Sequence, residues 1–243
     1  MRTLSTKKLI KEYGGAKVVR GVSIDIKEGE IVGLLGPNGA GKTTTFYMIT
    51  GMITPTSGEV LLSNDDITLM PMYKRAQIGI GYLAQEASVF TRLSVENNLR
   101  LALEMTALNK DQQNERLEEL LDEFSITHIR NNIAMTLSGG ERRRTEIARS
   151  LVVNPKFILL DEPYAGIDPL AVEEIQGIIL NLKKKGIGVL ITDHNVRETL
   201  SITDRSYLLY DGKVLFSGTS DEISTDKEAR RLYLGDKFKM ESR

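Results

Sequence analysis

The stretch EIVGLLGPNGAGKTTTF, residues 30–46, decides how the rest of the chain is interpreted. Residues 30–35 form a short and mostly apolar run, which is typical of a buried strand in a parallel sheet. A Gly-rich turn follows, and the pattern then predicts a helix from Lys42 to about Ile49. A strand, a Gly-rich turn and a helix in this order predict an α/β fold that holds a phosphate group at the start of the helix.

The turn fills every fixed position of the phosphate-loop pattern, or P-loop. Glycine permits the turns that aim backbone N–H groups at phosphate oxygens, and the helix start adds the positive end of its dipole. Lys42 is expected to place its charge against the β- and γ-phosphates of ATP, and the Thr43 hydroxyl to bind Mg²⁺. The predicted nucleotide-binding residues of the loop are Gly36, Pro37, Asn38, Gly39, Ala40, Gly41, Lys42, Thr43 and Thr44.

A second apolar run, residues 157–160, ends in two acidic residues, Asp161 and Glu162. The carboxyl ends of strands are where α/β sheets place their ligands. Asp161 is expected to hold Mg²⁺, and Glu162 to orient or deprotonate an attacking water. The alternative is a pair of solvated loop acids, since charged residues are mostly exposed. A P-loop in the same chain favours the catalytic interpretation.

Other local signals extend the α/β pattern. Residues 187–191 form a further apolar run, and Asp168 followed by Pro169 is typical of a helix start. That helix is expected to stop at Gly186. A strand, a helix and a strand in succession imply a right-handed crossover. Near the end of the chain, Asp211-Gly212 between two apolar runs predicts a β-hairpin.

The middle of the chain differs, because residues 94–150 carry no strand signal. Leu117, Leu120, Leu121 and Phe124 recur at helical spacing in a segment rich in Glu, Gln and Arg. We interpret residues 86–154 as a helical subdomain inserted into a core of residues 1–85 and 155–243. The whole chain, 1–243, is then a single domain.

Composition limits the classes of function. The chain has 243 residues, a formal net charge of -1, no cysteine and two histidines. This charge gives no overall electrostatic footprint for nucleic acid, and the missing cysteines exclude disulfides and thiolate catalysis. No signal-peptide pattern follows Met1, and no apolar run approaches the ~18 residues of a membrane span. We expect a cytoplasmic protein that reaches a membrane only through a partner.

The discriminating motif is LSGGE, residues 137–141, followed by RRRTEIAR. At this point the chain resembles the ATPase family of ABC transporters along essentially its whole length. The resemblance implies a P-loop NTPase (RecA-like) core with an N-terminal antiparallel β portion and an inserted α-helical subdomain. It also implies a homodimer, in which Ser138 and the amides of Gly139 and Gly140 bind the γ-phosphate of ATP held by the other subunit.

The same resemblance assigns roles to residues outside the P-loop. Gln85 resembles the glutamine that contacts Mg²⁺ and links to the transporter partner, and Tyr13 the aromatic residue that stacks on adenine. Tyr13 could also be an ordinary half-buried tyrosine. Residues 165–168, which end in Asp168, resemble the D-loop of the family. His194 resembles the switch histidine that contacts the γ-phosphate. The catalytic set is therefore Glu162, His194 and Gln85, and the metal set is Thr43, Gln85 and Asp161.

Within the family, five stretches of the chain resemble the ATPases of lipopolysaccharide export in Gram-negative bacteria. They are residues 33–48, 79–90, 137–144, 190–200 and 232–238. Ala84 and Tyr164 depart from that pattern, which usually has Pro and Phe there. The resemblance implies two integral inner-membrane partners, peripheral attachment to the cytoplasmic face, and no nucleic acid. Phe90 would line the groove that receives a partner's coupling helix. Its alternative is an ordinary core residue.

Two rival functions remain open at this stage. The ATPase of a branched-chain amino-acid importer shares the Asp-His-Asn sequence at residues 193–195. A soluble ABC ATPase acting on nucleic acid or ribosomes usually carries two cassettes, coiled-coil insertions or zinc cysteines, none of which this sequence shows. A non-catalytic regulator would be expected to lack Glu162 or His194, and both are present.

Overall fold

The computed structural model describes residues 1–235 and 238 of the chain. The strands are β1 (Thr3–Tyr13), β2 (Ala16–Val22), β3 (Asp25–Lys27), β4 (Ile31–Leu35), β5 (Ser57–Leu62), β6 (Asp65–Asp66), β7 (Ile80–Leu83), β8 (Phe157–Asp161), β9 (Gly188–Thr192), β10 (Arg205–Tyr210) and β11 (Lys213–Gly218). The helices are α1 (Lys42–Thr50), α2 (Met72–Gln77), α3 (Val95–Leu103), α4 (Lys110–Glu123), α5 (Gly139–Ser150), α6 (Pro169–Lys184), α7 (Val196–Ile202), α8 (Ser220–Thr225) and α9 (Lys227–Ala229). Short helical turns follow at η1 (Thr127–Ile129), η2 (Ala134–Thr136) and η3 (Arg230–Leu234).

A mixed sheet forms the centre, with the strand order β11-β10-β4-β9-β8-β7. The pairs from β10 to β7 are parallel, and β11 returns antiparallel to β10. The three apolar runs predicted as strands are β4, β8 and β9, each displaced by no more than one residue. The predicted hairpin is β10–β11, whose turn residues Asp211 and Gly212 have φ values of 48° and 75°. Such left-handed turns match the twist of the strands.

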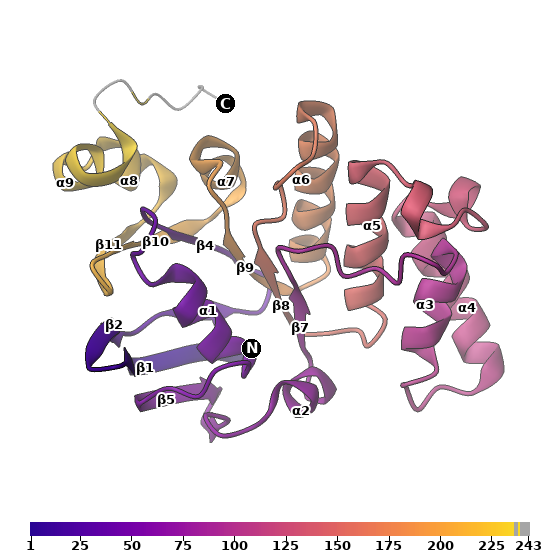
Figure 1. Cartoon of the computed structure of the whole chain (residues 1–243), viewed down its shortest axis with the longest axis horizontal. Coiled ribbons are helices and arrows are strands. Elements are labelled where there is room, and N and C mark those ends of the chain that lie inside the picture. The colour runs from indigo at the N-terminus through magenta and orange to yellow at the C-terminus, as the bar shows by residue number, and fades with distance from the viewer. Residues whose placement is uncertain (236–237, 239–243) are drawn as a thin grey trace.

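Both faces of this sheet are covered, which explains why its strands read as continuous apolar runs. Ile158 and Leu160 of β8 point into one hydrophobic core, which they share with α3 to α6. Leu159 of β8 points into the other core with Phe46 of α1 and Leu4 of β1. Helix α1 therefore lies between the central sheet and the N-terminal strands (Figure 1).

The N-terminal portion is an antiparallel sheet in which β1 pairs with β2, β3 and β5, and β5 pairs with β6. This arrangement agrees with the antiparallel β portion expected from the resemblance. Helices α3, α4 and α5 follow β7 in the chain and lie on the opposite side of the molecule from this sheet (Figure 1). Leu117, Leu120 and Leu121 of α4 are buried, as their spacing predicted.

The division of the chain into a core and a helical subdomain, with boundaries at residues 86 and 154, stays a prediction. Helix α5 contacts both β7 and α6 of the central layer as well as α3. Residues 239–243 of the predicted domain, and Asp236 and Lys237 of the stretch 232–238, lie outside the described residues. Among residues 1–235 and 238, no helix has the length and apolar character to cross a membrane.

Candidate nucleotide-hydrolysis site

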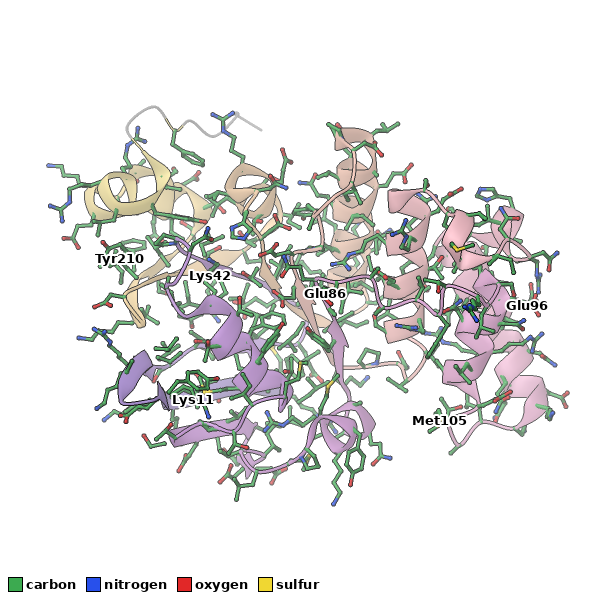
Figure 2. The ribbon with its side chains drawn as sticks, viewed as in Figure 1. Lys11, Lys42, Glu86, Glu96, Met105 and Tyr210 are labelled. Carbon is green, nitrogen blue, oxygen red and sulfur yellow. The ribbon has the colours of Figure 1, made fainter. Side chains whose placement is uncertain are left out.

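Four parallel strands deliver the predicted site residues to one edge of the central sheet. The P-loop follows β4, His194 follows β9, Glu162 follows β8, and Gln85 follows β7. Because these strands are neighbours in the order β4-β9-β8-β7, their carboxyl ends lie side by side. Figure 2 shows Lys42 and Glu86, the residue after Gln85, with the ends of β9 and β8 between them in this view.

Two glycines fix the path of the P-loop. Gly36 has a φ of 146°, and a Cβ placed there would lie 2.3 Å from the carbonyl oxygen of Leu209. Gly41 has a φ of 92° at the start of α1, and its Cβ would lie 2.9 Å from the carbonyl oxygen of Val18. Any side chain at either position would push the loop away from β10 or β2. The glycines are therefore required by packing as well as by the turn.

The Lys42 ammonium lies inside the curve of this loop. Its Nζ donates to the carbonyl oxygens of Gly36 at 2.7 Å and Pro37 at 3.1 Å. Burial lowers the pKa of Lys42, and the carboxylates of Glu162 and Asp161 oppose that shift. A buried ammonium close to two carboxylates carries a positive charge that can pair with a bound phosphate.

The remaining loop residues differ in exposure. Asn38, Gly39 and Thr43 are exposed, while Ala40 is buried and Thr44 is half-buried. Thr43 is an exposed residue in the first turn of α1, so its side chain is available to a metal ion. The positions of these residues are compatible with their predicted roles.

Asp161 is the last residue of β8 and is only 1% exposed. Burial, with the charge of neighbouring Glu162 as the second cause, raises the pKa of Asp161 to about 6. Its Oδ2 atom is buried and has no hydrogen-bond partner in the structure. A buried carboxylate oxygen without a partner is the kind of ligand that Mg²⁺ prefers. The residues present therefore fit a magnesium ion.

Glu162 adopts a left-handed backbone conformation, with a φ of 46°, which is uncommon for a residue other than glycine. Its amide donates to the carbonyl oxygen of Thr192 at 2.7 Å, so β9 holds the turn in place. Gln85 Nε2 donates to Glu162 Oε2 at 2.7 Å. His194 Nε2 lies 2.7 Å from Glu162 Oε1. The structure thus brings together the three residues predicted as catalytic.

Ser138 caps α5 through a reciprocal pair of hydrogen bonds. Its hydroxyl accepts from the amide of Glu141 at 3.3 Å, and its own amide donates to Glu141 Oε2 at 2.8 Å. The Ser138 hydroxyl also donates to Glu141 Oε2 at 2.8 Å, and this bond, followed by that of the Ser138 amide, lowers the pKa of Glu141. The capping box uses the third amide of the helix and leaves those of Gly139 and Gly140 at its N-terminus, as an anion site requires.

Gly139 and Gly140 of the LSGGE motif also have a packing role that the sequence did not reveal. A Cβ at Gly140 would lie 2.9 Å from Ala171 Cβ on α6. A Cβ at Gly139 would lie 3.2 Å from the carbonyl oxygen of Gly166 in the D-loop. Within one chain these residues face the D-loop and α6, and Figure 1 shows α5 beyond α6 and β8 from α1. The structure does not bring them to the P-loop of the same chain.

The other predicted site residues lie apart from this cluster. Asp168 caps α6, because its side chain accepts from the amide of Ala171 at 3.0 Å. That contact confirms the predicted N-cap. Tyr13 lies at the end of β1 with 47% of its surface exposed, and Lys11 Nζ lies 5.1 Å from its ring centroid. An exposed ring next to a cation is compatible with stacking on a base.

Phe90 is 50% exposed, which argues against the core-residue alternative. Asn98 of α3 fixes its backbone by accepting from the Phe90 amide at 2.8 Å and donating to its carbonyl oxygen at 3.2 Å. The guanidinium of Arg149 lies 5.4 Å from the ring centroid. The structure therefore presents an anchored aromatic ring at the surface, close to the segment that carries Gln85.

The sequence analysis assigned no role to Arg143, one of the three arginines that follow LSGGE. Arg143 is 5% exposed and donates to the carbonyl oxygens of Asp161 and Glu162, both at 3.1 Å. It also donates to the carbonyl oxygen of Ala84 at 2.8 Å and to Glu146 Oε2 at 3.0 Å. One guanidinium thus ties α5 to the ends of β7 and β8. No sequence signal marks it, because its acceptors are mainly backbone atoms.

Comparison with known proteins places these features in a family. The family described as ABC transporter matches residues 19–165. A probable ABC transporter ATP-binding protein of Azorhizobium caulinodans is 57% identical, over 96% of this chain and 83% of its own length. The lipopolysaccharide export system ATP-binding protein LptB of Escherichia coli K12 is 53% identical, over 99% of this chain and 100% of its own length.

Solved structures give the same picture. An ATP-binding cassette of an ABC transporter in its ADP conformation is 29% identical and has a TM-score of 0.87, covering 97% of this chain and 100% of that one. A dimeric cassette in a post-hydrolysis state, bound to ADP and phosphate, is 28% identical with a TM-score of 0.78, covering 89% and 98%. These likenesses confirm the predicted P-loop α/β fold class.

Proposed function

The chain belongs to the ABC transporter ATPase family, and from that premise we propose that it powers the export of lipopolysaccharide. It binds nucleotide and hydrolyses ATP, as members of this family do. The observation that carries the substrate assignment is similarity along the whole chain to relatives named as lipopolysaccharide export ATPases. The transported molecule would be drawn from the inner membrane and passed toward the outer membrane.

The residues at the edge of the sheet account for hydrolysis. The P-loop amides and the Lys42 ammonium bind and orient the phosphates of ATP. Thr43, Asp161 and Gln85 would hold Mg²⁺, which supplies charge to the phosphate oxygens. Glu162, placed next to Asp161 and held by Gln85 and His194, orients the attacking water and accepts its proton. His194, 54% exposed at the end of β9, is placed to meet the γ-phosphate.

We propose that the complete site needs two copies of the chain. Ser138, Gly139 and Gly140 present a helix N-terminus, and within one chain they pack toward the D-loop. A second copy in the opposite orientation can place that helix end against the γ-phosphate bound by Lys42. Asp168 and Tyr13 would complete the nucleotide contacts from the D-loop and β1. The homodimer closes on ATP and reopens after phosphate leaves.

The membrane connection is proposed to run through integral partners. Phe90 is anchored by Asn98 and exposed to receive a helix of an inner-membrane subunit. The nearby Gln85 contacts Glu162, so movement of this segment reaches the hydrolytic carboxylate. The chain would then be a cytoplasmic subunit, peripheral on the inner face of that membrane and bound to two transporter subunits.

The hydrolytic assignment is tested by Glu162→Gln. The amide keeps the size of the side chain but cannot accept a proton, so we expect turnover to fall by about a hundredfold or more. ATP binding should persist, and gel filtration with ATP and Mg²⁺ should show an accumulated dimer. Near-normal hydrolysis by this variant would contradict the role of Glu162.

The transport assignment is tested with the partners present. The chain should co-purify from native membranes with two integral proteins, and the reconstituted complex should release lipopolysaccharide when ATP is added. Phe90→Ala should reduce that co-purification, while the free subunit still hydrolyses ATP. Transport of a branched-chain amino acid instead would favour the importer alternative. A Phe90→Ala complex that still transports would contradict the proposed role of Phe90 in binding the partner helix.

A further inference from the structure

Asp193 is a buried carboxylate that the proposed mechanism does not use. It lies between Thr192, the last residue of β9, and His194, and it is 2% exposed. Burial raises the pKa of Asp193, while the backbone amides of Asn195 and Tyr164 favour its charged form. A buried carboxylate is costly unless its oxygens find hydrogen-bond donors, so its contacts are informative.

Each oxygen of Asp193 accepts from a different loop. Oδ2 accepts from the amide of Tyr164, which directly precedes the D-loop, at 3.0 Å. Oδ1 accepts from the amide of Asn195, which follows His194, at 2.8 Å. One side chain therefore fastens the loop after β8 to the loop after β9.

Packing and a second hydrogen bond support both loops near Asp193. Tyr164 is 2% exposed, and its side chain packs in the hydrophobic core. A second link joins the same two loops, because the Glu162 amide donates to the Thr192 carbonyl oxygen at 2.7 Å. Between these two links, His194 Nε2 meets Glu162 Oε1 at 2.7 Å.

We propose that Asp193 is a positioning residue for ATP hydrolysis, which holds the switch histidine His194 and the D-loop as one unit so that His194 stays against Glu162. It acts through the backbone and touches neither phosphate nor water. The inference rests on the proposed roles of Glu162 and His194. It adds that the D-loop cannot shift without carrying the histidine with it.

The test is Asp193→Asn, which keeps the shape but offers a single acceptor oxygen. Its amide nitrogen would face a backbone N–H, so one of the two loops must detach. We expect kcat to fall by about tenfold to a hundredfold, because small displacements of catalytic groups have effects of that size. Affinity for ADP, measured by fluorescence of a labelled nucleotide, should change by less than threefold.

Asp204→Asn is the matched control. Asp204 also bridges two segments, because its Oδ2 accepts from the Ile31 amide at 2.9 Å and its Oδ1 pairs with Lys183. It lies at the amino end of β10 and β4, away from the site. We expect this variant to lose stability without a matching loss of kcat. Equal losses of kcat in the two variants would overturn the proposal.

A readout independent of activity is available because the chain has two histidines. His128→Gln assigns the imidazole proton signals, leaving His194 to report on its contact with Glu162. Glu162→Gln should move the His194 signal clearly in the otherwise native chain and by less than half as much in the Asp193→Asn chain. Equal movement in both backgrounds would overturn the proposal. Should Asp193→Asn fail to fold, Asp193→Ser, which also keeps one acceptor, takes the same measurements.

The proposed hydrolytic role of Glu162 and the proposed positioning role of Asp193 are contradicted by different results. An active Glu162→Gln variant contradicts the proposed hydrolytic site, whatever the signal of His194 does. Full kcat for Asp193→Asn, beside an inactive Glu162→Gln, contradicts only the positioning role.

Discussion

At the scale of single residues, two buried charges of the site have opposite effects. The Lys42 ammonium stabilises a bound phosphate, whereas the Asp161 carboxylate destabilises the folded protein. Asp161 is buried with an unpartnered Oδ2 atom, and its pKa is raised to about 6. Above that pH the folded chain carries a charge that the unfolded chain would solvate better. The difference from the ordinary value near 3.8 corresponds to about 3 kcal/mol of stability.

Asp161→Asn should therefore stabilise the metal-free chain while abolishing hydrolysis. The raised pKa means that the protonated form is favoured in the folded state, so this contribution to stability is lost as pH rises through about 6. The gain in the melting temperature over the unmutated chain should be largest at pH 7.5. It should shrink toward pH 5, where Asp161 in the folded chain is mostly protonated and, like asparagine, uncharged. Melting curves across that range check the prediction. An equal difference at both pH values would contradict it.

At the scale of elements, one buried guanidinium joins α5 to the ends of two strands of the sheet. Arg143 joins the helix to the carbonyl oxygens of Asp161, Glu162 and Ala84. Those strand ends carry the metal ligand, the hydrolytic carboxylate and the glutamine segment. The helix that offers its N-terminus to a second copy is thus fastened to the hydrolytic site of its own chain.

Arg143→Lys should lower stability by about 2–4 kcal/mol and reduce kcat, because one ammonium nitrogen cannot reach all the acceptors that the separate guanidinium nitrogens bind and so leaves buried carbonyls unpaired. Arg144→Lys is the matched control on the same helix. Arg144 pairs with Glu174, which is 49% exposed, and we expect its replacement to cost less than about 1 kcal/mol. Urea titrations with ATPase assays compare the two. Similar losses in both variants would show that the buried contacts of Arg143 carry no special weight.

At the scale of the whole molecule, each copy contributes half of each proposed site. Lys42→Ala disables the P-loop, and Ser138→Asp retains a helix cap while placing a negative charge where the γ-phosphate should bind. Neither variant has a working site alone. A mixed dimer of the two has one intact pair, so mixing them should restore part of the ATPase activity.

The control for this mixture is the double variant Lys42→Ala/Ser138→Asp combined with the native chain. Its mixed dimers contain no intact pair, so they should add nothing to the activity of the native dimers. Restored ATPase activity in the first mixture, with none beyond that of the native dimers in the second, would show that the LSGGE motif of one copy acts on the nucleotide bound by the other. Full activity of Ser138→Asp on its own would contradict a shared site.

Local signals were enough to predict the elements that carry the chemistry. The strands β4, β8 and β9 are apolar runs, and Asp168-Pro169 marks the start of α6. The strand order was not predictable, because placing β9 between β4 and β8 depends on contacts between distant segments. The roles of Arg143 and Asp193 also escaped, since both side chains bind backbone atoms that any sequence provides.

The central position of β9 has a consequence for how the chain is made. β9 pairs with β4 and β8, yet it follows β8 by the 26 residues 162–187. At ordinary rates of synthesis, the ribosome adds those residues in roughly 1–5 s, during which β4 and β8 have unpaired edges that invite misassociation. A nascent chain that stops at Glu162, the residue after β8, already has its P-loop and both acidic residues. Its sheet still lacks β9 between β4 and β8, so it cannot fold into a working half of the dimer.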